Sequence, residues 1–558
     1  MHRMNYLARL LPFLNWPRLN RGLLRGELMA GLAVGLMVIP QGVAYALLAG
    51  MPLVTGIYAA LLPALVGALW GASLRLSVGP TALTCLLVSA SLHGLATPAS
   101  PEWVNLAVWL ALLSGALQVV LGFARFGWLL NLVNTPVLMA FTQAAAILIV
   151  SSQLPDLLGL RLESGWLANP QILAIHWPAV CFGLGSLALL MLARRWKPAF
   201  PSVLVLVLGS AGVAYALGFE ASGGAVVGTL PAGLPSLVLP EWPGWRQLEQ
   251  LIMPMLVISL VSFLETASSA KVDNERLGRP WNQNQDLIGQ GLAKLAAGLC
   301  GAMPTSASFS RSALFLYTGA RTGWATLFTV AVVLAGLLVL TPVLHHVPRA
   351  VLAAIVLAAV LGMLKPREFV RLWRVSRVEA VCAAATFAVT LLAAPRLYWG
   401  VLVGVLMTLS HFLYHHLHPR IIELGLHADG RLRDRHLWHL PPVAPHTYAL
   451  RMDAELDFAA AAEFERHVVD HLSAHPDVRH VCLMAQPINR MDATGADTLL
   501  RLTRHLHAQG IALHISGIKL PAEQVLRRAG GLQPHTLLHI HTTDAEALAA
   551  LTASDTGA

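Results

Sequence analysis

The chain has 558 residues, of which 56% are hydrophobic and only 12% are charged, and its formal net charge is +9. Soluble domains usually carry about 25% charged residues, so this composition excludes an ordinary soluble protein. The basic residues cluster at the ends of apolar runs, as they do in membrane proteins with positively charged cytoplasmic loops. The positive net charge is therefore explained by the cytoplasmic loops, and no nucleic-acid partner is predicted. The expected surrounding of the apolar runs is membrane lipid.

Residues 1–26 form a basic segment interrupted by prolines, with arginines at Arg3, Arg9, Arg18, Arg21 and Arg25. Such a segment is typical of a cytoplasmic N-terminus rather than of a cleaved signal peptide. The long apolar runs lie within residues 27–417, and the remaining C-terminal residues have the composition of a small soluble domain. The length therefore divides into one large membrane domain and one small tail domain.

A membrane-spanning helix needs about 20 mainly apolar residues, and fourteen stretches of this chain are candidates. They lie near residues 27–49, 53–71, 79–94, 103–123, 127–153, 171–193, 200–218, 249–269, 284–303, 308–318, 323–344, 348–364, 379–394 and 397–417. A Gly/Pro-rich segment from Phe219 to Trp245 separates the first seven from the last seven.

The connections between these spans alternate in charge. If the N-terminus is cytoplasmic, the even-numbered connections are cytoplasmic too, and they carry most of the basic residues, including Arg75, Arg125, Arg321 and the run "KPREFVRLWRVSR". This pattern predicts a multi-pass protein of the plasma (inner) membrane with both termini in the cytoplasm. Because seven is odd, the second half enters with the opposite orientation, and inverted halves are typical of secondary transporters.

Two of the predicted spans are short and interrupted. "LRLSVGPTALTCLLVSASL" is third in the first half, "PTSASFSRSALFLYTG" is third in the second half, and each has proline and serine before its apolar part. A half-helix that starts inside the membrane has unpaired N–H groups and a partial positive charge at its N-terminus. We expect the two N-termini to face each other near the bilayer midplane and to form an anion-binding cradle.

Arg311, flanked by Ser308 and Ser310, adds a permanent charge and hydrogen-bond donors to this predicted cradle. The structural alternatives are that Arg311 extends to the cytoplasmic face or pairs with a carboxylate. Gln41 follows the helix-breaking Pro40, and Tyr45 lies four residues later on the same helix face. The structural alternative for Gln41 is an interhelical hydrogen bond.

Glu265 lies in the first span of the second half, the counterpart of the Gln41 span. A carboxylate buried in a membrane is costly when charged, so Glu265 is the candidate to carry a proton or bind a sodium ion. The structural alternative is an ion pair with Lys294 or Arg311. No cofactor is expected beyond a co-transported H⁺ or Na⁺, and no metal site is predicted.

The tail alternates strand-like and helical patterns and is predicted to be a small α/β domain. The expected strands are "TYALRM", "VRHVCLMA" and "IALHISG", and the expected helices are "AAAAEFERHVVDHLSAH" and "ATGADTLLRLTRHLHAQG". In the loop "NRMDATGADTLL", Thr494 is expected to cap the following helix. The histidines of "HFLYHHLHPR" are assigned to a helix at the membrane interface rather than to a metal site, because no carboxylate or cysteine nearby completes one.

The quoted residues resemble the SulP family, the sulfate permeases and related anion exchangers. "VIPQGVAYALLAGMPLVTGIYAALLPALVGALWGASLRLSVGPTAL" resembles its first conserved block, and "SFLETASSAK" with "GAMPTSASFSRSALFLYTGART" resembles its second. The tail resembles a STAS domain, a module shared with anti-sigma-factor antagonists. Ala493 stands where those antagonists carry their phosphorylated serine, so that switch is absent here. Thr494 is a weaker candidate for phosphorylation than for the capping role given above.

This resemblance implies a polytopic α-helical membrane protein with a seven-plus-seven inverted repeat like that of uracil permeases. It implies a basic N-terminal segment (1–26), a transport domain (27–417), a linker (418–440) and a STAS domain (441–555). A core of spans 1–4 and 8–11 would move against a gate of spans 5–7 and 12–14 in an elevator motion. A homodimer is expected, and the STAS domain is expected to offer a surface for a regulatory partner.

Carried over by motif, the resemblance implies an anion site formed by Gln41, Tyr45, Thr81, Ser308, Phe309, Ser310 and Arg311. Glu265 matches the position tied to cation or proton coupling in some members. Lys294 departs from the asparagine associated with the family, and neutralisation of Glu265 by this lysine would remove proton coupling.

The function expected first is secondary active transport of small inorganic anions, with sulfate as the leading substrate. A bicarbonate or C4-dicarboxylate transporter, an anion exchanger and a channel-like or signalling protein remain as alternatives, because one arginine and a set of N–H groups suit any small oxyanion. The chain has no Walker A motif and no nucleophile elbow, which argues against ATP-driven transport and against an enzyme.

Overall fold

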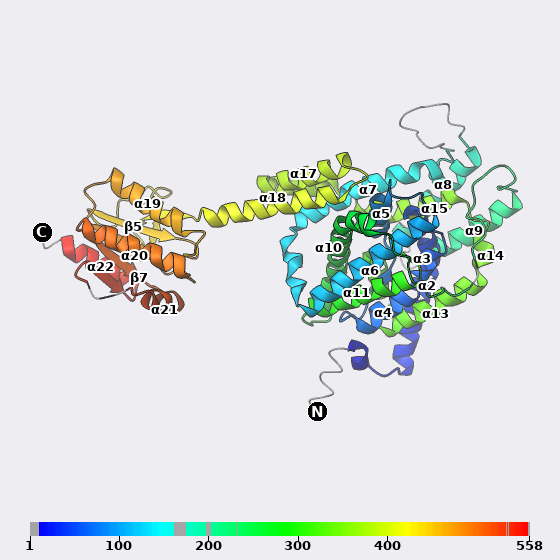
Figure 1. Cartoon of the computed structure of the whole chain (residues 1–558), viewed down its shortest axis with the longest axis horizontal. Helices are drawn as coiled ribbons and strands as arrows, with labels where there is room; N and C mark the ends of the chain where they lie inside the picture. The colour runs from blue at the N-terminus through cyan, green and yellow to red at the C-terminus, as the bar shows by residue number, and fades with distance from the viewer. Residues whose placement is uncertain are drawn as a thin grey trace. The chain divides into compact units, whose positions relative to one another are not determined.

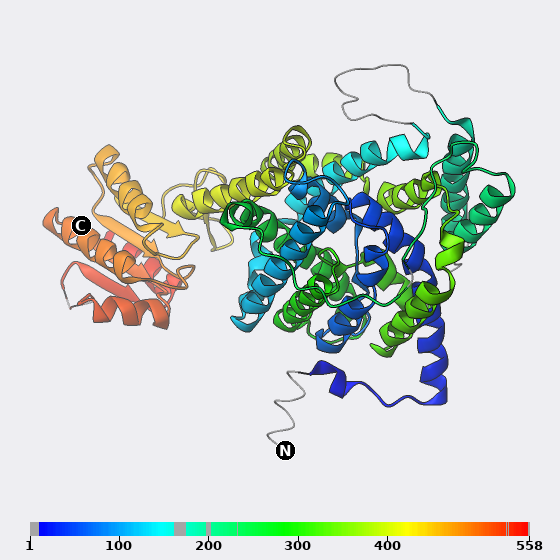
Figure 2. The ribbon, with the colours of Figure 1, turned by 45° about the vertical axis from the view of Figure 1, so that its right-hand side comes forward.

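The computed structural model describes residues 11–160, 175–196, 202–231, 233–531, 533 and 535–555. The first residues of the predicted sixth and seventh spans lie outside these ranges, as do Arg3 and Arg9. The chain forms two compact units, which we call the transmembrane unit (Met1–Thr408) and the tail unit (Leu409–Ala558). Figures 1 and 2 show a helical bundle for the first and a sheet covered by helices for the second.

The transmembrane unit is helical, apart from two short strands. Its first-half elements are η1 (Pro12–Asn15), α2 (Arg21–Leu48), α3 (Thr55–Tyr58), α4 (Leu62–Trp70), β1 (Val78–Gly79), α5 (Ala82–Leu92), α6 (Pro101–Phe123), η2 (Phe126–Leu132), α7 (Thr135–Leu157), α8 (Trp177–Trp196) and α9 (Ser202–Ala216). The second half has α10 (Trp245–Arg276), α11 (Gln283–Leu299), β2 (Ser306–Ala307), α12 (Phe309–Tyr317), α13 (Trp324–Val339), α14 (Thr341–Leu344), α15 (Arg349–Val360), η3 (Leu361–Met363), α16 (Pro366–Val375), α17 (Arg377–Leu392) and α18 (Tyr398–Leu417), the last of which runs into the tail unit.

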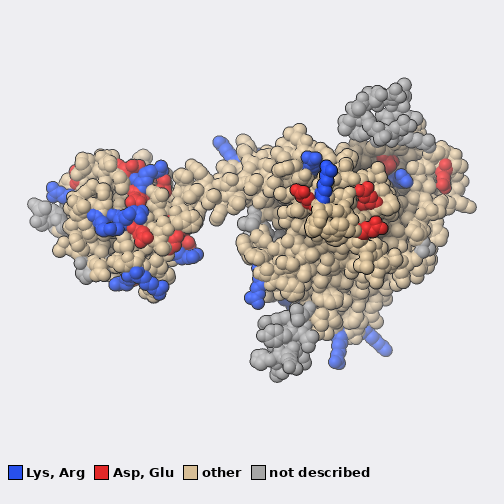
Figure 3. Space-filling model, in the orientation of Figure 1, with Lys and Arg blue, Asp and Glu red and all other residues tan. Residues whose placement is uncertain are grey.

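Each of the fourteen predicted spans contains a helix or a short run of helices. Among the described residues, six helices are long and apolar enough to cross a membrane on their own. The basic run "KPREFVRLWRVSR", expected to be only a connection, contains the separate helix α16. Figure 3 shows broad uncharged areas on the transmembrane unit and closely spaced charges of both signs on the tail unit, as expected for lipid-facing and water-facing surfaces.

The two interrupted segments are short helices, as predicted. Helix α5 has 11 residues and α12 has 9. At about 1.5 Å of rise per residue, neither reaches much beyond half of the roughly 30 Å hydrocarbon core of a bilayer. Each helix is preceded by a two-residue strand in place of further helical turns, so the backbone between strand and helix is free to line a site.

Helices α6 and α11 pack through glycines that let their backbones approach closely. A Cβ atom on Gly115 would lie 2.7 Å from the carbonyl oxygen of Gly291, and a Cβ on Gly291 would lie 2.7 Å from the carbonyl oxygen of Gly115. Real side-chain atoms do not come this close, so only glycine fits at both positions. Small residues are the usual means of tight helix packing in membranes.

Gly291→Ala is therefore expected to lower the thermal stability of the detergent-solubilised protein. Forcing an extra methyl group into a tight contact typically costs about 1–3 kcal/mol. Gly185→Ala in α8 is the matched control, because a Cβ at that glycine meets no atom within 4 Å. If the melting temperatures of the two variants are equal, the glycine contact does not stabilise the unit.

The tail unit contains one six-stranded sheet in the order β4-β3-β5-β6-β7-β8. Its strands are β3 (Ile421–Leu426), β4 (Leu432–Asp434), β5 (Thr447–Met452), β6 (His480–Met484), β7 (Ala512–Ser516) and β8 (Leu538–His541). Strands β5 to β8 are parallel, and β3 runs antiparallel to β4 and β5. Thus residues 418–440, predicted to be a linker, contribute β3 and β4 to the sheet.

Alternate residues of the central strands enter two separate cores. Tyr448 and Leu450 of β5 pack with α19 (Ala461–Ala474), α20 (Ala493–Ala508) and α21 (Leu520–Arg528) on one face. Ala449 of β5 packs with α22 (Asp544–Asp555) on the other. The sheet is therefore buried on both faces, which agrees with the nearly continuous apolar character of its parallel strands.

Candidate functional site

Strands β1 and β2 join the two halves of the transmembrane unit. They pair antiparallel, with Val78 opposite Ala307 and Gly79 opposite Ser306, and Ser308 N donates to Ser77 O at 2.9 Å. Since α5 and α12 begin within three residues of these strands, their N-termini converge on the same two-stranded ribbon. This is the arrangement in which two helix N-termini can act on one anion.

The N-terminus of each short helix is capped by a predicted site residue. Thr81 Oγ1 accepts from Thr84 N at 3.4 Å, and Ser308 Oγ accepts from Arg311 N at 3.5 Å. Both cap residues are in the extended conformation typical of N-caps. The hydroxyl groups therefore fix the helix starts, and the other first-turn N–H groups remain for a ligand.

Arg311 lies in the first turn of α12 and is only 1% exposed. Its Nε donates to Ser77 Oγ at 3.1 Å and its Nη1 donates to Pro80 O at 2.9 Å. Its Nη2 is buried without a hydrogen-bond partner among the described residues, and a Cβ on Gly79 would lie 3.1 Å from it. One edge of the guanidinium is thus held by the protein. Because a buried charged donor without a partner is costly, an anion that accepts a hydrogen bond from Nη2 would remove this cost.

The structure supports neither structural alternative for Arg311. The side chain does not extend to the surface, and among the described residues it forms no ion pair. The proposed interhelical hydrogen bond of Gln41 is also absent from the described residues: Gln41 is 3% exposed and its Oε1 has no partner.

The remaining predicted site residues differ in exposure. Tyr45 is buried, four residues after Gln41 on α2. Ser308 and Ser310 bring their Oγ atoms within 3.2 Å of each other, and Ser310 is exposed. Phe309 is 59% exposed at the start of α12.

Glu265 contacts the cradle directly from α10. Its Oε2 accepts from Thr81 Oγ1 at 3.1 Å and from Thr84 Oγ1 at 3.3 Å. The carboxylate therefore lies at the first turn of α5, and both hydroxyls tie α10 to that helix. A change in charge at Glu265 would act on an element that also shapes the predicted anion site.

Lys294 is fully buried and does not pair with Glu265 as the structural alternative required. Its Nζ donates to Gln118 Oε1 and to Ser262 Oγ, both at 2.7 Å. The carbonyl of Ser262 accepts from Ser306 Oγ of β2 at 3.1 Å. Lys294 of α11 thus links α6 and α10 next to strand β2. No described basic residue forms an ion pair with Glu265.

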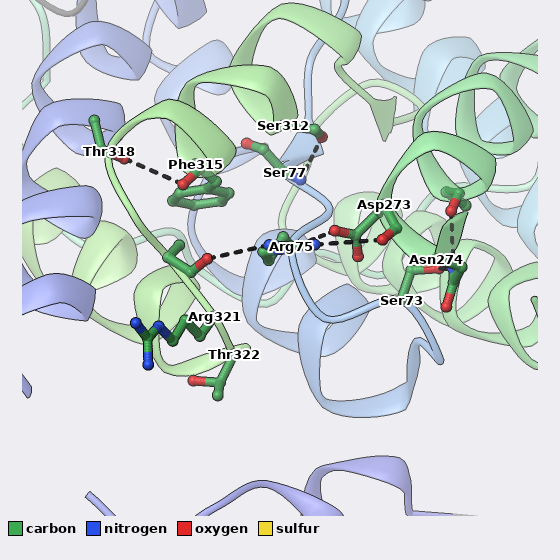
Figure 4. Close-up of polar contacts among 12 residues, drawn as sticks. Ser73, Arg75, Ser77, Asp273, Asn274, Ser312, Phe315, Thr318, Arg321 and Thr322 are labelled. Atoms are coloured by element: carbon green, nitrogen blue, oxygen red, sulfur yellow. Dashed lines mark hydrogen bonds and ion pairs between the residues drawn. The ribbon is translucent and has the colours of Figure 1, made fainter. Parts of the chain in front are cut away.

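A second polar network supports the ribbon, and sequence reasoning missed it. Arg75 Nε pairs with Asp273 Oδ1 at 2.5 Å, and Asn274 Nδ2 donates to Ser73 Oγ at 2.9 Å (Figure 4). Ser312 Oγ accepts from Ser77 N at 3.0 Å. These contacts hold the segment before β1 against α10 and α12. Arg75 had been assigned only to a basic connection, and nothing in the local sequence shows that its partner lies almost two hundred residues away.

In the tail unit, Asp492 caps α20, not Thr494 as predicted. Asp492 Oδ1 accepts from Gly495 N at 2.8 Å, and its Oδ2 accepts from Phe458 N at 2.9 Å. Thr494 lies in the first turn and is exposed. A carboxylate at the N-cap also suits the positive end of the helix dipole.

The carboxylate of Asp457 contacts His416 Nε2 at 3.0 Å. This partner was not predicted for that histidine, which had been assigned to a helix at the membrane interface.

Three histidines of the tail sheet form a chain of ring contacts. His514 Nε2 lies 3.2 Å from His480 Nδ1, and His514 Nδ1 lies 3.1 Å from His541 Nε2. Burial and the neighbouring imidazoles of His539, His480 and His541 lower the pKa of His514 to about 3. At neutral pH His514 is therefore uncharged.

The tail unit is expected to lose stability in mild acid. A histidine in the unfolded chain has a pKa of about 6.5, so between about pH 3 and 6.5 the unfolded chain binds more protons at His514 than the folded one. Stability is full above this window and falls as the pH drops through it. Hydrogen exchange of the β6 and β7 amides in the full chain should show this loss at pH 5 relative to pH 7, and His514→Gln should reduce it. An unchanged pH dependence in that variant would assign the effect to other groups.

Comparison with known proteins gives a consistent result over nearly the whole chain. Residues 24–386 match the sulfate permease family, and residues 441–547 match the STAS domain. The chain is 32% identical over 528 residues to the probable sulfate transporter MT1781 of Mycobacterium tuberculosis, covering 93% of this chain and 94% of that protein. It is 30% identical over 561 residues to the chloroplastic sulfate transporter 4.1 of Arabidopsis thaliana, covering 95% and 81%.

Solved structures show the same fold. SLC26A9 superposes with a TM-score of 0.88 at 19% identity, covering 99% of this chain and 94% of that chain. The transmembrane domain of the cyanobacterial bicarbonate transporter BicA superposes with a TM-score of 0.61 at 21% identity, covering 70% and 99%. From its sequence and its fold, the chain belongs to the sulfate permease family and is a multi-pass membrane anion transporter with a C-terminal STAS domain.

Proposed function

We propose that this protein is a secondary active transporter of small inorganic anions, with sulfate as its leading substrate. The observation that carries the proposal is the buried guanidinium of Arg311, which lies where two helix N-termini converge. One edge is held by Ser77 and Pro80, and Nη2 has no hydrogen-bond partner within the part of the chain that the structure describes. A planar guanidinium with fixed orientation can bind an oxyanion through parallel hydrogen bonds.

The anion site is proposed to comprise Arg311, the caps Thr81 and Ser308, and the further residues Gln41, Tyr45, Phe309 and Ser310. The hydroxyl and amide groups supply hydrogen-bond donors, and the N-termini of α5 and α12 supply partial positive charge. Such a site recognises charge and oxygen geometry more than chemical identity. The site alone therefore does not select sulfate over other oxyanions. Sulfate is the leading substrate because the similar proteins from Mycobacterium tuberculosis and Arabidopsis thaliana are named sulfate transporters.

Transport is proposed to follow an elevator motion, in which spans 1–4 and 8–11 form a core that carries the site past a gate of spans 5–7 and 12–14. The contacts of β1 with β2 and of α10 with α5 join elements of the predicted core to one another. The site would therefore move as one body. We further propose that the protein is a homodimer, as the resemblance to its family implies. We also propose that it lies in the plasma (inner) membrane with both termini cytoplasmic, because the distribution of basic residues favours that orientation.

Coupling to H⁺ or Na⁺ is proposed to occur at Glu265. Its carboxylate accepts hydrogen bonds from Thr81 and Thr84 at the N-terminus of α5. A cation bound to Glu265 would therefore change the charge and the hydrogen bonds next to the anion site. A bicarbonate transporter is the second candidate, because the fold is shared with BicA; transport of a C4-dicarboxylate, exchange and channel-like conduction are the remaining alternatives.

The decisive experiment measures uptake of labelled sulfate, bicarbonate and succinate into proteoliposomes containing the full chain. Each anion is tested with no gradient, with an imposed pH gradient and with a sodium gradient. The proposal expects saturable sulfate uptake that increases with one of the two cation gradients. Preferred uptake of bicarbonate would select the second candidate, and uptake that responds to no cation gradient would indicate an exchanger or a facilitator.

A further inference from the structure

Three potential metal ligands lie together in the transmembrane unit, far along the chain from the cradle. One ligand atom from each of Glu220, His345 and His346 can be chosen so that all lie within 4.8 Å of one another. His345 Nε2 and Glu220 Oε2 are 3.6 Å apart. Ligands bound to tetrahedral Zn²⁺ at about 2.0–2.2 Å lie about 3.3–3.6 Å from one another, so small side-chain rotations would bring all three around one ion.

The backbone around this cluster is held by main-chain hydrogen bonds. The segment after α9 pairs with the connection between α14 and α15: Val227 N donates to Val347 O at 2.9 Å, Gly228 N donates to His345 O at 3.1 Å, and Arg349 N donates to Ala225 O at 2.9 Å. Figure 1 shows α9 and α14 side by side. Because these bonds use only main-chain atoms, they position the two imidazoles without occupying ring nitrogens.

The cluster is accessible to an ion from solution. The Glu220 side chain is 58% exposed and that of His345 is 27% exposed. A cavity of about 410 Å³ lies beside them and is lined by Glu220 and His346, among other residues. The space is sufficient for an ion and its remaining water.

We propose that Glu220, His345 and His346 bind Zn²⁺, with water as the fourth ligand, and that the bound ion slows transport. Two imidazoles and one carboxylate with an open position are a donor set that Zn²⁺ favours. Both segments lie in odd-numbered connections, which the charge pattern assigns to the extracytoplasmic side. The site is therefore open to Zn²⁺ outside the cell.

The effect on transport follows from what the site connects. The connection that carries His345 and His346 joins the last span of the predicted core to the first following span of the predicted gate, whereas Glu220 follows the last span of the first gate segment. An ion bound to all three side chains would add to the main-chain bonds that already hold this connection to the segment after α9. It would therefore stiffen the connection between core and gate and oppose an elevator motion. This part rests on the proposed function, whereas metal binding does not.

Binding is tested on the full chain in detergent by titration of ZnCl₂ against a chromophoric chelator. The tail unit has many histidines that also bind Zn²⁺, so the measured quantity is the difference between wild type and variants. The wild type is expected to hold one more tightly bound Zn²⁺ per chain than His345→Ala/His346→Ala, and Glu220→Gln is expected to weaken this site at least about tenfold. His93→Ala, at the exposed histidine that directly follows α5, is the control and should match the wild type. Equal stoichiometry in the wild type and the double variant would overturn the site.

The effect on transport is tested by adding ZnCl₂ to the extracytoplasmic side of proteoliposomes. Sulfate uptake by the wild type should fall, EDTA should restore it, and the double histidine variant should be insensitive. Zinc that binds without changing uptake would overturn the inhibitory role. Absence of any anion uptake in zinc-free buffer would instead contradict the proposed function and leave the binding result standing.

Discussion

Arg311→Ala is expected to abolish or severely weaken anion binding while the protein still folds. The variant removes the buried guanidinium whose Nη2 is the proposed anion donor. A hydrogen bond to a charged group contributes about 1.5–3 kcal/mol, which corresponds to a loss in affinity of about 10- to 150-fold. Calorimetric titration of the purified protein with sulfate measures this loss, and size-exclusion chromatography shows whether the variant is folded.

Two further variants separate the role of the charge from the role of its geometry. Arg311→Lys should recover only part of the affinity, because an ammonium group keeps the charge but cannot reach Ser77, Pro80 and an anion in one plane. Arg321→Ala removes the same charge from an exposed position and should leave the affinity nearly unchanged. Unaltered sulfate affinity in Arg311→Ala, or an equal loss in Arg321→Ala, would rule out the assignment of Arg311 to the site.

Glu265→Gln is expected to leave anion exchange largely intact and to remove the dependence of uptake on a pH or sodium gradient. Importing a divalent anion against a negative-inside potential costs about 2.3 kcal/mol per charge per 100 mV, so an importer needs a co-transported cation. The glutamine keeps an oxygen that can accept from Thr81 and Thr84, so the contact between α10 and α5 is preserved. Uptake into proteoliposomes with imposed gradients measures the change.

Thr84→Val is the matched test of a merely structural role for Glu265. It deletes one hydrogen bond to the same carboxylate but leaves the titratable group in place. If Glu265 only fastens α10 to α5, the Thr84 variant should lose gradient dependence as the Glu265 variant does. If Glu265 carries the cation, only Glu265→Gln should lose it. A Glu265→Gln protein that follows the gradient as steeply as the wild type would show that this carboxylate is not the coupling group.

The sequence by itself determined the elements whose formation depends on local pattern. Apolar runs of sufficient length became the helices of the transmembrane unit, since a chain in lipid must satisfy its backbone within each segment. The predicted strand "TYALRM" coincides with β5 from its first residue to its last. Its alternate residues pack into two separate cores. The positions of proline and serine before two short apolar runs were enough to predict the broken helices α5 and α12.

Only the tertiary structure decided which polar groups meet. Thr81 and Glu265 are separated by 184 positions and contact each other only because β1 pairs with β2 and α10 packs against α5. Lys294 was expected as the alternative ion-pair partner of Glu265, yet its ammonium group donates to Gln118 and Ser262.

The same limit explains the other errors and omissions. Strands β3 and β4 fall in the segment that was assigned to a linker, and they form because β3 pairs with β5 at the edge of the parallel strands and β4 pairs with β3. Asp492 rather than Thr494 caps α20 because the path of the chain places its carboxylate against two N–H groups. The cluster of Glu220, His345 and His346 was not predicted at all, because two segments that lie over a hundred residues apart are joined there by main-chain hydrogen bonds, which leave no mark on the side-chain sequence.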